Sequence, residues 1–340
     1  MNERLVRVGD IELCYESLGD PEHPTVLLIM GLNLSMDWWR DDFCANLVAR
    51  GFHVVRFDNR DVGRSTHVRG PGITAWEFLR RRANPVYTLG DMADDAAGLI
   101  AHVDPRGAHV VGASLGSMVA QEVAIRHPQR TRSLVSIMGR PGDGRTGKVS
   151  WQRIPDFLRP PVADPIEGMV AAFRRIGSAD RTAQDDEDVR VTMRRSLARE
   201  RGDGSSRQLA ACVGERDRTA DLGRLTMPAL VLHGERDKVI VPSGGRATAA
   251  AIPGAELLEV PRMGHDLARW VWPTVIEGIA RTAGRAVPTP AEPTGVPESR
   301  ADTTDPDRAV GATGHDEAVP VDVHRGQREQ RAGDPAQPSQ

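Results

Sequence analysis

The five residues Gly112-Ala113-Ser114-Leu115-Gly116 decide the fold. The apolar run His109–Gly112 leads into them and predicts a buried strand, and the Ala- and Val-rich segment Leu115–His127 predicts a helix directly after them. A serine at a sharp strand-to-helix turn needs small neighbours two positions to either side, because strand and helix pack closely there. In a chain with 34 glycines the run is also compatible with an ordinary glycine-rich turn. Its place between strand and helix favours a strained turn that presents the Ser114 hydroxyl.

Outward from this turn, strand-length apolar runs alternate with longer helical patterns. Such an order builds a parallel sheet covered by helices on both faces. Arg4–Val8 and Ile11–Tyr15 flank Gly9-Asp10, which predicts a hairpin at an antiparallel edge of the sheet. The chain is therefore assigned to the α/β class with a mostly parallel central sheet. Further strands are expected at Thr25–Met30, His53–Phe57, Ser133–Met138, Ala229–His233 and Glu256–Val260.

Helices replace the strand rhythm between Arg140 and Thr226. Asp164-Pro165-Ile166-Glu167 has the pattern of a capped helix start. A helical insertion between strands of a parallel sheet is expected to cover the carboxyl edge, where ligands bind in such folds. We therefore interpret residues 141–226 as a lid. Its two apolar stripes are Ile166, Met169, Val170, Phe173 and Ile176, followed by Val189, Met193 and Leu197.

The composition of residues 285–340 excludes a hydrophobic core. This stretch has no Leu, Ile, Met, Phe, Trp or Tyr, and it holds eight of the 24 prolines. Low hydrophobicity with many prolines predicts a disordered, proline-rich tail. We expect one folded domain over residues 1–284, followed by this tail.

A serine hydroxyl is a weak nucleophile at neutral pH and needs a base within hydrogen-bonding reach. When a serine lies on such a turn, the orienting carboxylate and then the base histidine come later in the chain. Three histidines of the folded part follow Ser114 and are therefore candidates for the base: His127, His233 and His265. His127 ends a predicted helix, where a cation is favourable, and His233 closes a strand, where a buried structural histidine is expected. His265 lies on the loop after the last strand. It is our candidate base.

An imidazole base needs a carboxylate that orients it. Asp237 follows the penultimate strand by a few residues, at the sheet edge where Ser114 and His265 are also expected. Glu235 in the same loop is the main alternative, and Asp143 and Asp221 are further ones. We favour Asp237 as the acid.

An acyl-transfer intermediate also needs two backbone donors for its oxyanion. One is the N–H of Leu115, which directly follows the serine. The second is expected from the loop after Thr25–Met30, and the usual geometry of this loop indicates the N–H of Leu32. Gly31 in that loop is also compatible with an ordinary turn.

Charge and cysteine content exclude several classes of partner. The net charge is −3, and no basic stripe suits a nucleic acid. Cys14, Cys44 and Cys212 are odd in number and widely spaced, which argues against disulfides and thiolate zinc sites. The N-terminus has no apolar leader, and no apolar run is long enough to span a membrane. We expect a soluble, cytoplasmic protein without a membrane or nucleic-acid partner. The sequence identifies no particular protein partner, and the proline-rich tail is compatible with an interaction segment as well as with a solvated extension.

No cofactor or metal is expected. Gly142–Lys148 has the spacing of a phosphate-binding loop, but Val149 stands where a hydroxyl would hold Mg²⁺. Aromatic side chains are candidates for an apolar substrate pocket: Trp38 and Trp39 follow the Leu32 loop, and Trp151 lies in the lid.

Together these residues resemble the α/β-hydrolase superfamily over roughly residues 4–284. The segment Asp58-Asn59-Arg60-Asp61-Val62-Gly63-Arg64-Ser65 looks like a loop frequent in that family, in which we take Asp58 and Arg60 as structural. Ile29–Ser35 and Ile252–Leu257 are similar to aclacinomycin methylesterase-like esterases, which remove a methyl ester from an aromatic polyketide.

The resemblance implies a serine hydrolase that cleaves a carboxylic ester of an apolar or aromatic small molecule. Lactone, thioester and C–C bond hydrolysis are alternatives, because one Ser-His-Asp set serves all of them. A non-catalytic binder with the same fold is a further alternative.

Overall fold

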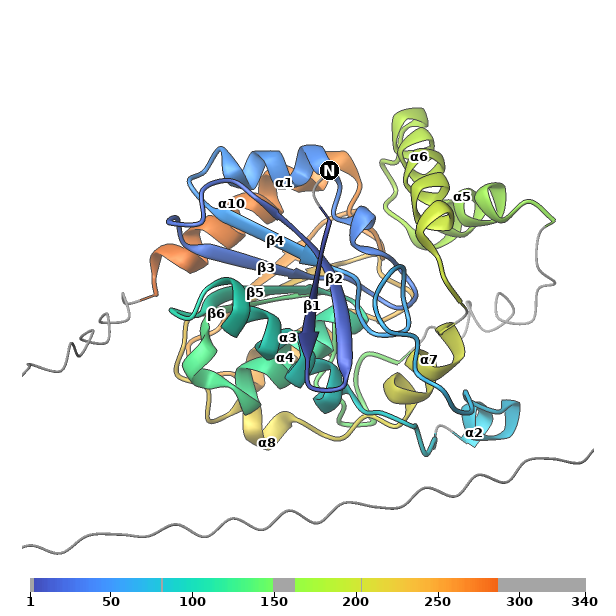
Figure 1. Cartoon of the computed structure of the whole chain (residues 1–340), viewed down its shortest axis with the longest axis horizontal. Helices are drawn as coiled ribbons and strands as arrows, with labels where there is room; N and C mark the ends of the chain where they lie inside the picture. Colours follow the sequence, from blue (N-terminus) through green and yellow to red (C-terminus); the bar gives the residue numbers. More distant parts are fainter. Residues whose placement is uncertain (1–2, 81, 149–162, 203, 287–340) are drawn as a thin grey trace, which may run out of the picture. The chain divides into compact units, whose positions relative to one another are not determined.

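The computed structural model describes residues 3–80, 82–148, 163–202 and 204–286. Within these ranges, eight strands form one sheet in the order β1-β2-β4-β3-β5-β6-β7-β8 (Figure 1). β2 is antiparallel to both β1 and β4, and every pair from β4 to β8 is parallel. The expected mostly parallel sheet with an antiparallel edge is confirmed. The strands are β1 Arg4–Val8, β2 Ile11–Leu18, β3 Thr25–Ile29, β4 His53–Phe57, β5 Ala108–Ala113, β6 Thr131–Ile137, β7 Ala229–Gly234 and β8 Glu256–Val260.

Strand ends differ from the sequence prediction where pairing with a neighbour extends them. β2 continues to Leu18 because Tyr15–Leu18 pairs with β4. The central strands β3, β4, β5 and β7 are buried at every residue, which explains their continuous apolar runs.

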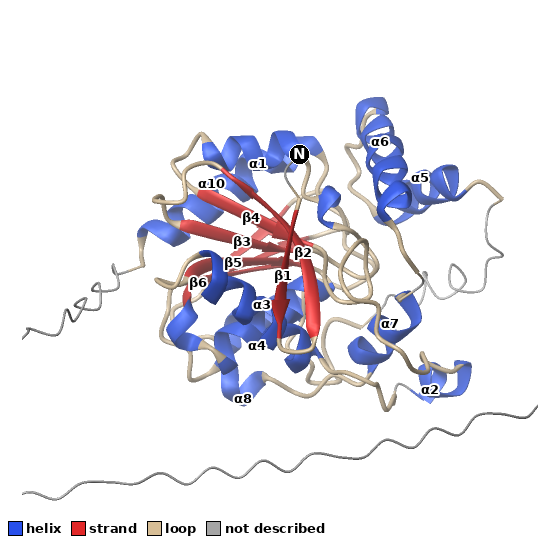
Figure 2. Ribbon diagram, in the orientation of Figure 1, coloured by secondary structure: helices blue, strands red, loops and turns tan. Residues whose placement is uncertain are grey.

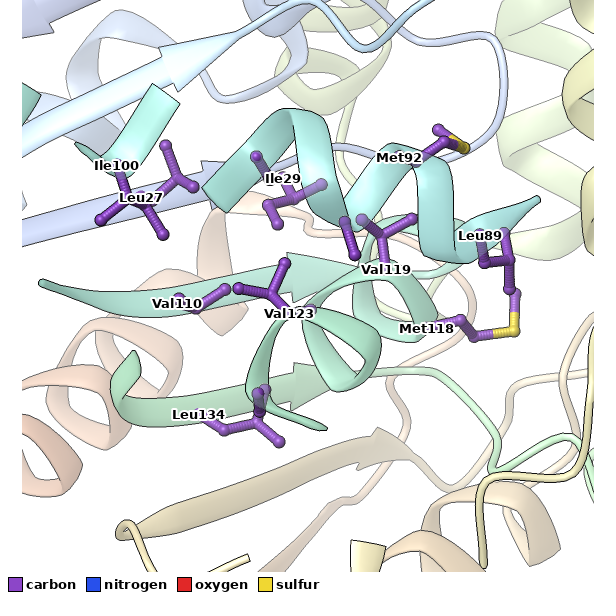
Figure 3. Close-up of a cluster of buried hydrophobic side chains, with 14 of the residues drawn as sticks. Leu27, Ile29, Leu89, Met92, Ile100, Val110, Met118, Val119, Val123 and Leu134 are labelled. Carbon is purple, nitrogen blue, oxygen red and sulfur yellow. The ribbon is translucent and has the colours of Figure 1, made fainter. Parts of the chain in front are cut away.

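Helices cover both faces of the sheet (Figure 2). On one face lie α1 and α10, and on the other lie α3, α4, α8 and α9. Figure 3 shows side chains of α3 and α4 packed against those of β3, β5 and β6. The helices outside the insertion are α1 Asp41–Val48, α2 Ala75–Arg80, α3 Leu89–Val103, α4 Leu115–Arg126, α9 Ser243–Ala251 and α10 Trp272–Gly284.

The segment between β6 and β7 contains four helices in its described part, here called the inserted helices. Asp164 caps the first of them by accepting a hydrogen bond from the Ile166 N–H (2.8 Å). Glu167 pairs with Arg190 of the next helix. The inserted helices are α5 Pro165–Ile176, α6 Ala183–Arg199, α7 Ser205–Val213 and α8 Thr219–Leu222.

The buried face of α6 differs from the apolar stripe expected for it. Val189 is buried, but Leu197 is 42% exposed. The face turned toward the rest of the protein is instead mostly polar, because its carboxylates and one arginine pair with opposite charges on other segments. The buried residues of α6 are Asp185, Asp186, Asp188, Val189, Thr192 and Arg199.

The expected boundaries of the lid and of the tail stay predictions. Residues 149–162 and 287–340, which hold part of the lid and nearly all of the tail, lie outside the described residues. Among the helices that are described, none combines the length and the hydrophobicity needed to cross a bilayer.

We predict that Gly116→Ala destabilises the protein. A Cβ at position 116 would lie 2.2 Å from the carbonyl oxygen of Ile29, so the backbone of β3 or α4 would have to shift. Overpacking of this kind costs about 1–3 kcal/mol of unfolding free energy, measured by urea denaturation. Gly284→Ala is the control, because a Cβ there meets nothing within 4 Å. Equal stabilities of the two variants would contradict close packing at the turn.

Candidate active site

Ser114 lies on a strained turn between β5 and α4. Its backbone has φ +57° and ψ −121°, outside the usual regions for a residue with a side chain. The Ser114 N–H donates to the carbonyl oxygen of Ile137 on β6 (2.9 Å), which fixes the turn to the neighbouring strand. A Cβ at Gly112 would lie 2.0 Å from the Gly116 carbonyl oxygen. Glycine at both positions therefore lets the strand and the helix approach as closely as they do.

Three side chains from separate loops meet at the carboxyl edge of the sheet. The Oγ of Ser114 lies 2.8 Å from Nε2 of His265. The Nδ1 of His265 lies 2.7 Å from Oδ2 of Asp237. The structure thus brings together Ser114, His265 and Asp237, the three residues that the sequence indicated.

The Asp237 carboxylate is buried and held by several donors. Its Oδ1 accepts hydrogen bonds from the N–H groups of Val239 (2.8 Å) and Ile240 (3.0 Å). Burial alone raises the pKa of Asp237, but the charge of His265 and hydrogen bonds from His233 and His265 outweigh it and lower the pKa to about 2. The carboxylate is therefore ionised throughout the neutral range.

The alternative carboxylates lie elsewhere. Glu235 is exposed to solvent. Asp143 accepts hydrogen bonds within its own turn, from the N–H groups of Arg145 and Thr146. Asp221 pairs with two arginines, Arg216 and Arg224.

The two alternative histidines have structural partners. His127 pairs with Asp94 at the end of α4. His233 is fully buried, and its Nε2 lies 2.7 Å from the carbonyl oxygen of Ile240. The sequence did not indicate that Nε2 of His233 would also lie 3.4 Å from Oδ2 of Asp237.

The backbone around Ser114 offers candidate donors for an oxyanion. Leu115 opens α4, and the first N–H groups of a helix have no partner within it. The loop after β3 passes beside the serine, since a Cβ on Gly31 would lie 3.3 Å from the Ser114 Cβ. Leu32 follows and lines the same cavity as Ser114. Both predicted donor residues thus lie next to the serine.

A cavity of about 460 Å³ opens above Ser114 and His265. Its size falls in the range of pockets for small organic ligands. Charged side chains also reach it, but Arg40 and Arg269 share two carboxylates. Both arginines pair with Asp188 and with Asp42, which leaves little uncompensated charge. Much of the lining is apolar and includes Leu34, Trp38, Met169, Phe173, Ile176 and Val189.

An aromatic pair joins the sheet side of the cavity to the inserted helices. Trp38 stacks on Phe173 of α5, with ring centroids 5.0 Å apart and planes 11° apart. Of the tryptophans expected in a pocket, Trp38 lines the cavity, whereas Trp39 is buried in the core against Phe43. Trp151 lies outside the described residues.

Asp266 is a site neighbour that sequence reasoning missed. Its Oδ1 accepts from the Ser178 N–H (2.8 Å), and its Oδ2 pairs with Arg181 (2.6 Å). The His265 N–H also donates to the carbonyl oxygen of Ile176 (2.8 Å). The histidine loop is therefore fastened to the junction of α5 and α6. The sequence places Asp266 beside His265 but gives no signal for its partners, which lie more than 80 residues away.

Comparison with known proteins identifies the family. The family model for the alpha/beta hydrolase fold matches residues 24–268. The chain belongs to the α/β hydrolase fold family. This α/β hydrolase is similar to the rhodomycin D methylesterases of Streptomyces peucetius and Streptomyces sp. (strain C5). Each is 30% identical over 299 residues, which cover 78% of this chain and 93% of the relative.

Solved structures show the same fold. The enol-lactonase from Burkholderia xenovorans LB400 superposes with a TM-score of 0.65 at 19% identity, covering 83% of this chain and 100% of that one. A hydrolase from Pseudomonas aeruginosa PA01 gives 0.63 at 26% identity, covering 84% and 99%. The expected fold and family are confirmed.

We predict that Asp237→Asn lowers p-nitrophenyl butyrate hydrolysis by about 10³-fold or more, because an amide cannot hold the imidazole in the required tautomer or stabilise its cation. Glu235→Gln is the matched control and should stay within about 2-fold, since Glu235 is exposed. The measurement compares the initial rates of both purified variants with that of the original protein. A larger loss for Glu235→Gln would move the acid role to Glu235.

Proposed function

We propose that this α/β hydrolase cleaves a carboxylic ester through a Ser114-His265-Asp237 triad and an acyl-enzyme. The observation that carries the proposal is the unbroken series of contacts from Ser114 Oγ through His265 to Asp237, at 2.8 and 2.7 Å. These distances match the reach that a nucleophile and its base require.

In the first half-reaction His265 removes the Ser114 proton while Oγ attacks the ester carbonyl carbon. The carbonyl oxygen becomes an oxyanion, and the N–H groups of Leu32 and Leu115 donate to it. When the tetrahedral intermediate breaks down, His265 returns the proton to the departing alkoxide, and the alcohol leaves. The acyl group is then esterified to Ser114.

In the second half-reaction a water molecule takes the place of the alcohol. His265 removes one of its protons as the oxygen attacks the acyl carbon, and the proton then passes to Ser114 Oγ as the carboxylic acid leaves. Asp237 remains an anion and stabilises the imidazolium formed in each half-reaction. This sequence of steps requires no cofactor.

A methyl ester of a polyketide-like small molecule is the substrate class that we propose. The likeness to rhodomycin D methylesterases supports it, because their names state methyl ester cleavage. The apolar cavity with the stacked Trp38 and Phe173 rings supports an aromatic acyl group, since planar rings pack well on such a wall.

The test is a panel of methyl esters of polycyclic aromatic acids, with product acid and methanol measured by mass spectrometry. We expect turnover that Ser114→Ala lowers by about 10³-fold or more at an unchanged melting temperature. A Ser114→Ala rate above about a hundredth of the original would contradict the covalent route.

The same panel includes lactones, thioesters and β-diketones, so that the alternatives are tested alongside. Turnover of one of these classes in place of the methyl esters would assign the alternative chemistry to the same triad. A folded protein that binds the aromatic acids but turns over nothing would be a ligand binder.

A further inference from the structure

Gln208 of α7 joins the loop after β3, which borders the site, to the loop after β4. Its Oε1 accepts a hydrogen bond from the Asn33 N–H (2.8 Å), and its Nε2 donates to the carbonyl oxygen of Arg60 (2.8 Å). The side chain is fully buried. A flipped amide would set donor against donor and acceptor against acceptor, so these two contacts allow only one orientation.

The Asn33 contact fixes a turn made by Gly31–Leu34. The Leu34 N–H donates to the Gly31 carbonyl oxygen (3.3 Å), and Asn33 has φ +56° at the third position of the turn. Turns of types I and II differ by a flip of the central peptide, and a positive φ at the third position belongs to type II. The Asn33 N–H lies in this central peptide. Gln208 therefore anchors the central peptide of the turn to α7 and so holds the closed turn as a unit.

The same turn sets the direction of the Leu32 N–H. In a trans peptide the C=O and N–H bonds point to opposite sides. Because the Gly31 carbonyl turns inward to Leu34, the Leu32 N–H of that peptide points the other way, out of the turn. The preceding carbonyl, of Met30, accepts from Nδ2 of Asn59 (3.0 Å), so the entrance to the turn is fixed as well.

We propose that Gln208 is a positioning residue for the oxyanion donor: it holds the Gly31–Leu34 turn so that the Leu32 N–H stays available to the reacting carbonyl oxygen. This inference rests on the proposed function, because it deepens the role of Leu32. An inserted helix then fixes backbone geometry beside the nucleophile.

Gln208→Leu removes both contacts at similar volume. We expect kcat for p-nitrophenyl butyrate to fall about 10-fold with KM changed less than about 3-fold, since the oxyanion forms only in the transition state. The affinity for an aryl trifluoromethyl ketone, which forms an oxyanion on the serine, should fall by a similar factor. An unchanged kcat in the folded variant would overturn the proposal.

Two further variants separate positioning from loss of stability. Gln208→Glu keeps an acceptor for the Asn33 N–H, and burial favours the protonated carboxyl, which can also donate to the Arg60 carbonyl oxygen. This variant should recover at least about 3-fold of the kcat lost in Gln208→Leu. Gln121→Leu removes another fully buried glutamine, whose amide contacts Ser136 and Arg218 on the far side of α4 from the turn. It should lower the melting temperature but leave kcat within about 2-fold. An equal loss of kcat in Gln121→Leu would contradict the positioning role, because it would show that Gln208 affects kcat only through the stability of the fold.

Hydrogen exchange tests the proposal without any substrate. In the original protein the Asn33 amide should exchange slowly although the residue is exposed, and Gln208→Leu should speed its exchange at least about 10-fold. Unchanged exchange would overturn the proposal even if an ester is hydrolysed. A protein that hydrolyses no ester, yet shows the exchange difference, would contradict the proposed function and leave the holding of the turn by Gln208 supported.

Discussion

The close approach of β5 and α4 at Ser114 is the constraint on which the site depends. Glycine at 112 and 116 lets the backbones approach to distances that any Cβ would prevent, and the serine between them takes a positive φ. The resulting turn points Oγ away from α4, whose N-terminus it does not cap, toward His265. The parallel strands β7 and β8 place the other two side chains of the candidate triad. Both strands end at the same edge of the sheet as β5, and the loops after them carry Asp237 and His265. The arrangement of the three side chains therefore depends on the strand order as well as on the local turn.

The inserted helices are attached to this edge by charge as much as by apolar packing. Arg199 of α6 pairs with Asp58 and Asp37, and Arg181 after α5 pairs with Asp266 beside His265. Removing one partner of a buried pair costs about 3–5 kcal/mol, so these contacts specify where the helices lie. The insertion thereby shapes the cavity and reaches the loops that carry the proposed catalytic groups. A change in the inserted helices is expected to alter both substrate fit and the alignment of those groups.

Much of the fold and the candidate triad could be predicted from the sequence, because their signals are local. Continuous apolar runs predict the buried strands. The glycine-flanked turn after β5 indicates Ser114, and the loops that follow the last two strands indicate Asp237 and His265. What could not be predicted depends on contacts distant in sequence. The polar buried face of α6 has no periodic apolar pattern, so Leu197 was expected on a face that it does not occupy. Gln208 and Asp266 act on partners 175 and 88 residues away, and their types alone carry no sign of it.

The most direct test of this account asks whether the strained turn carries an activated serine. The folded protein is treated with a fluorophosphonate, its intact mass is measured, and the modified peptide is mapped. We predict one adduct, on Ser114, because His265 lies within hydrogen-bonding distance of its Oγ and can remove its proton. A folded protein that gains no adduct, or gains it on another residue, would contradict the claim that the turn, His265 and Asp237 together activate Ser114.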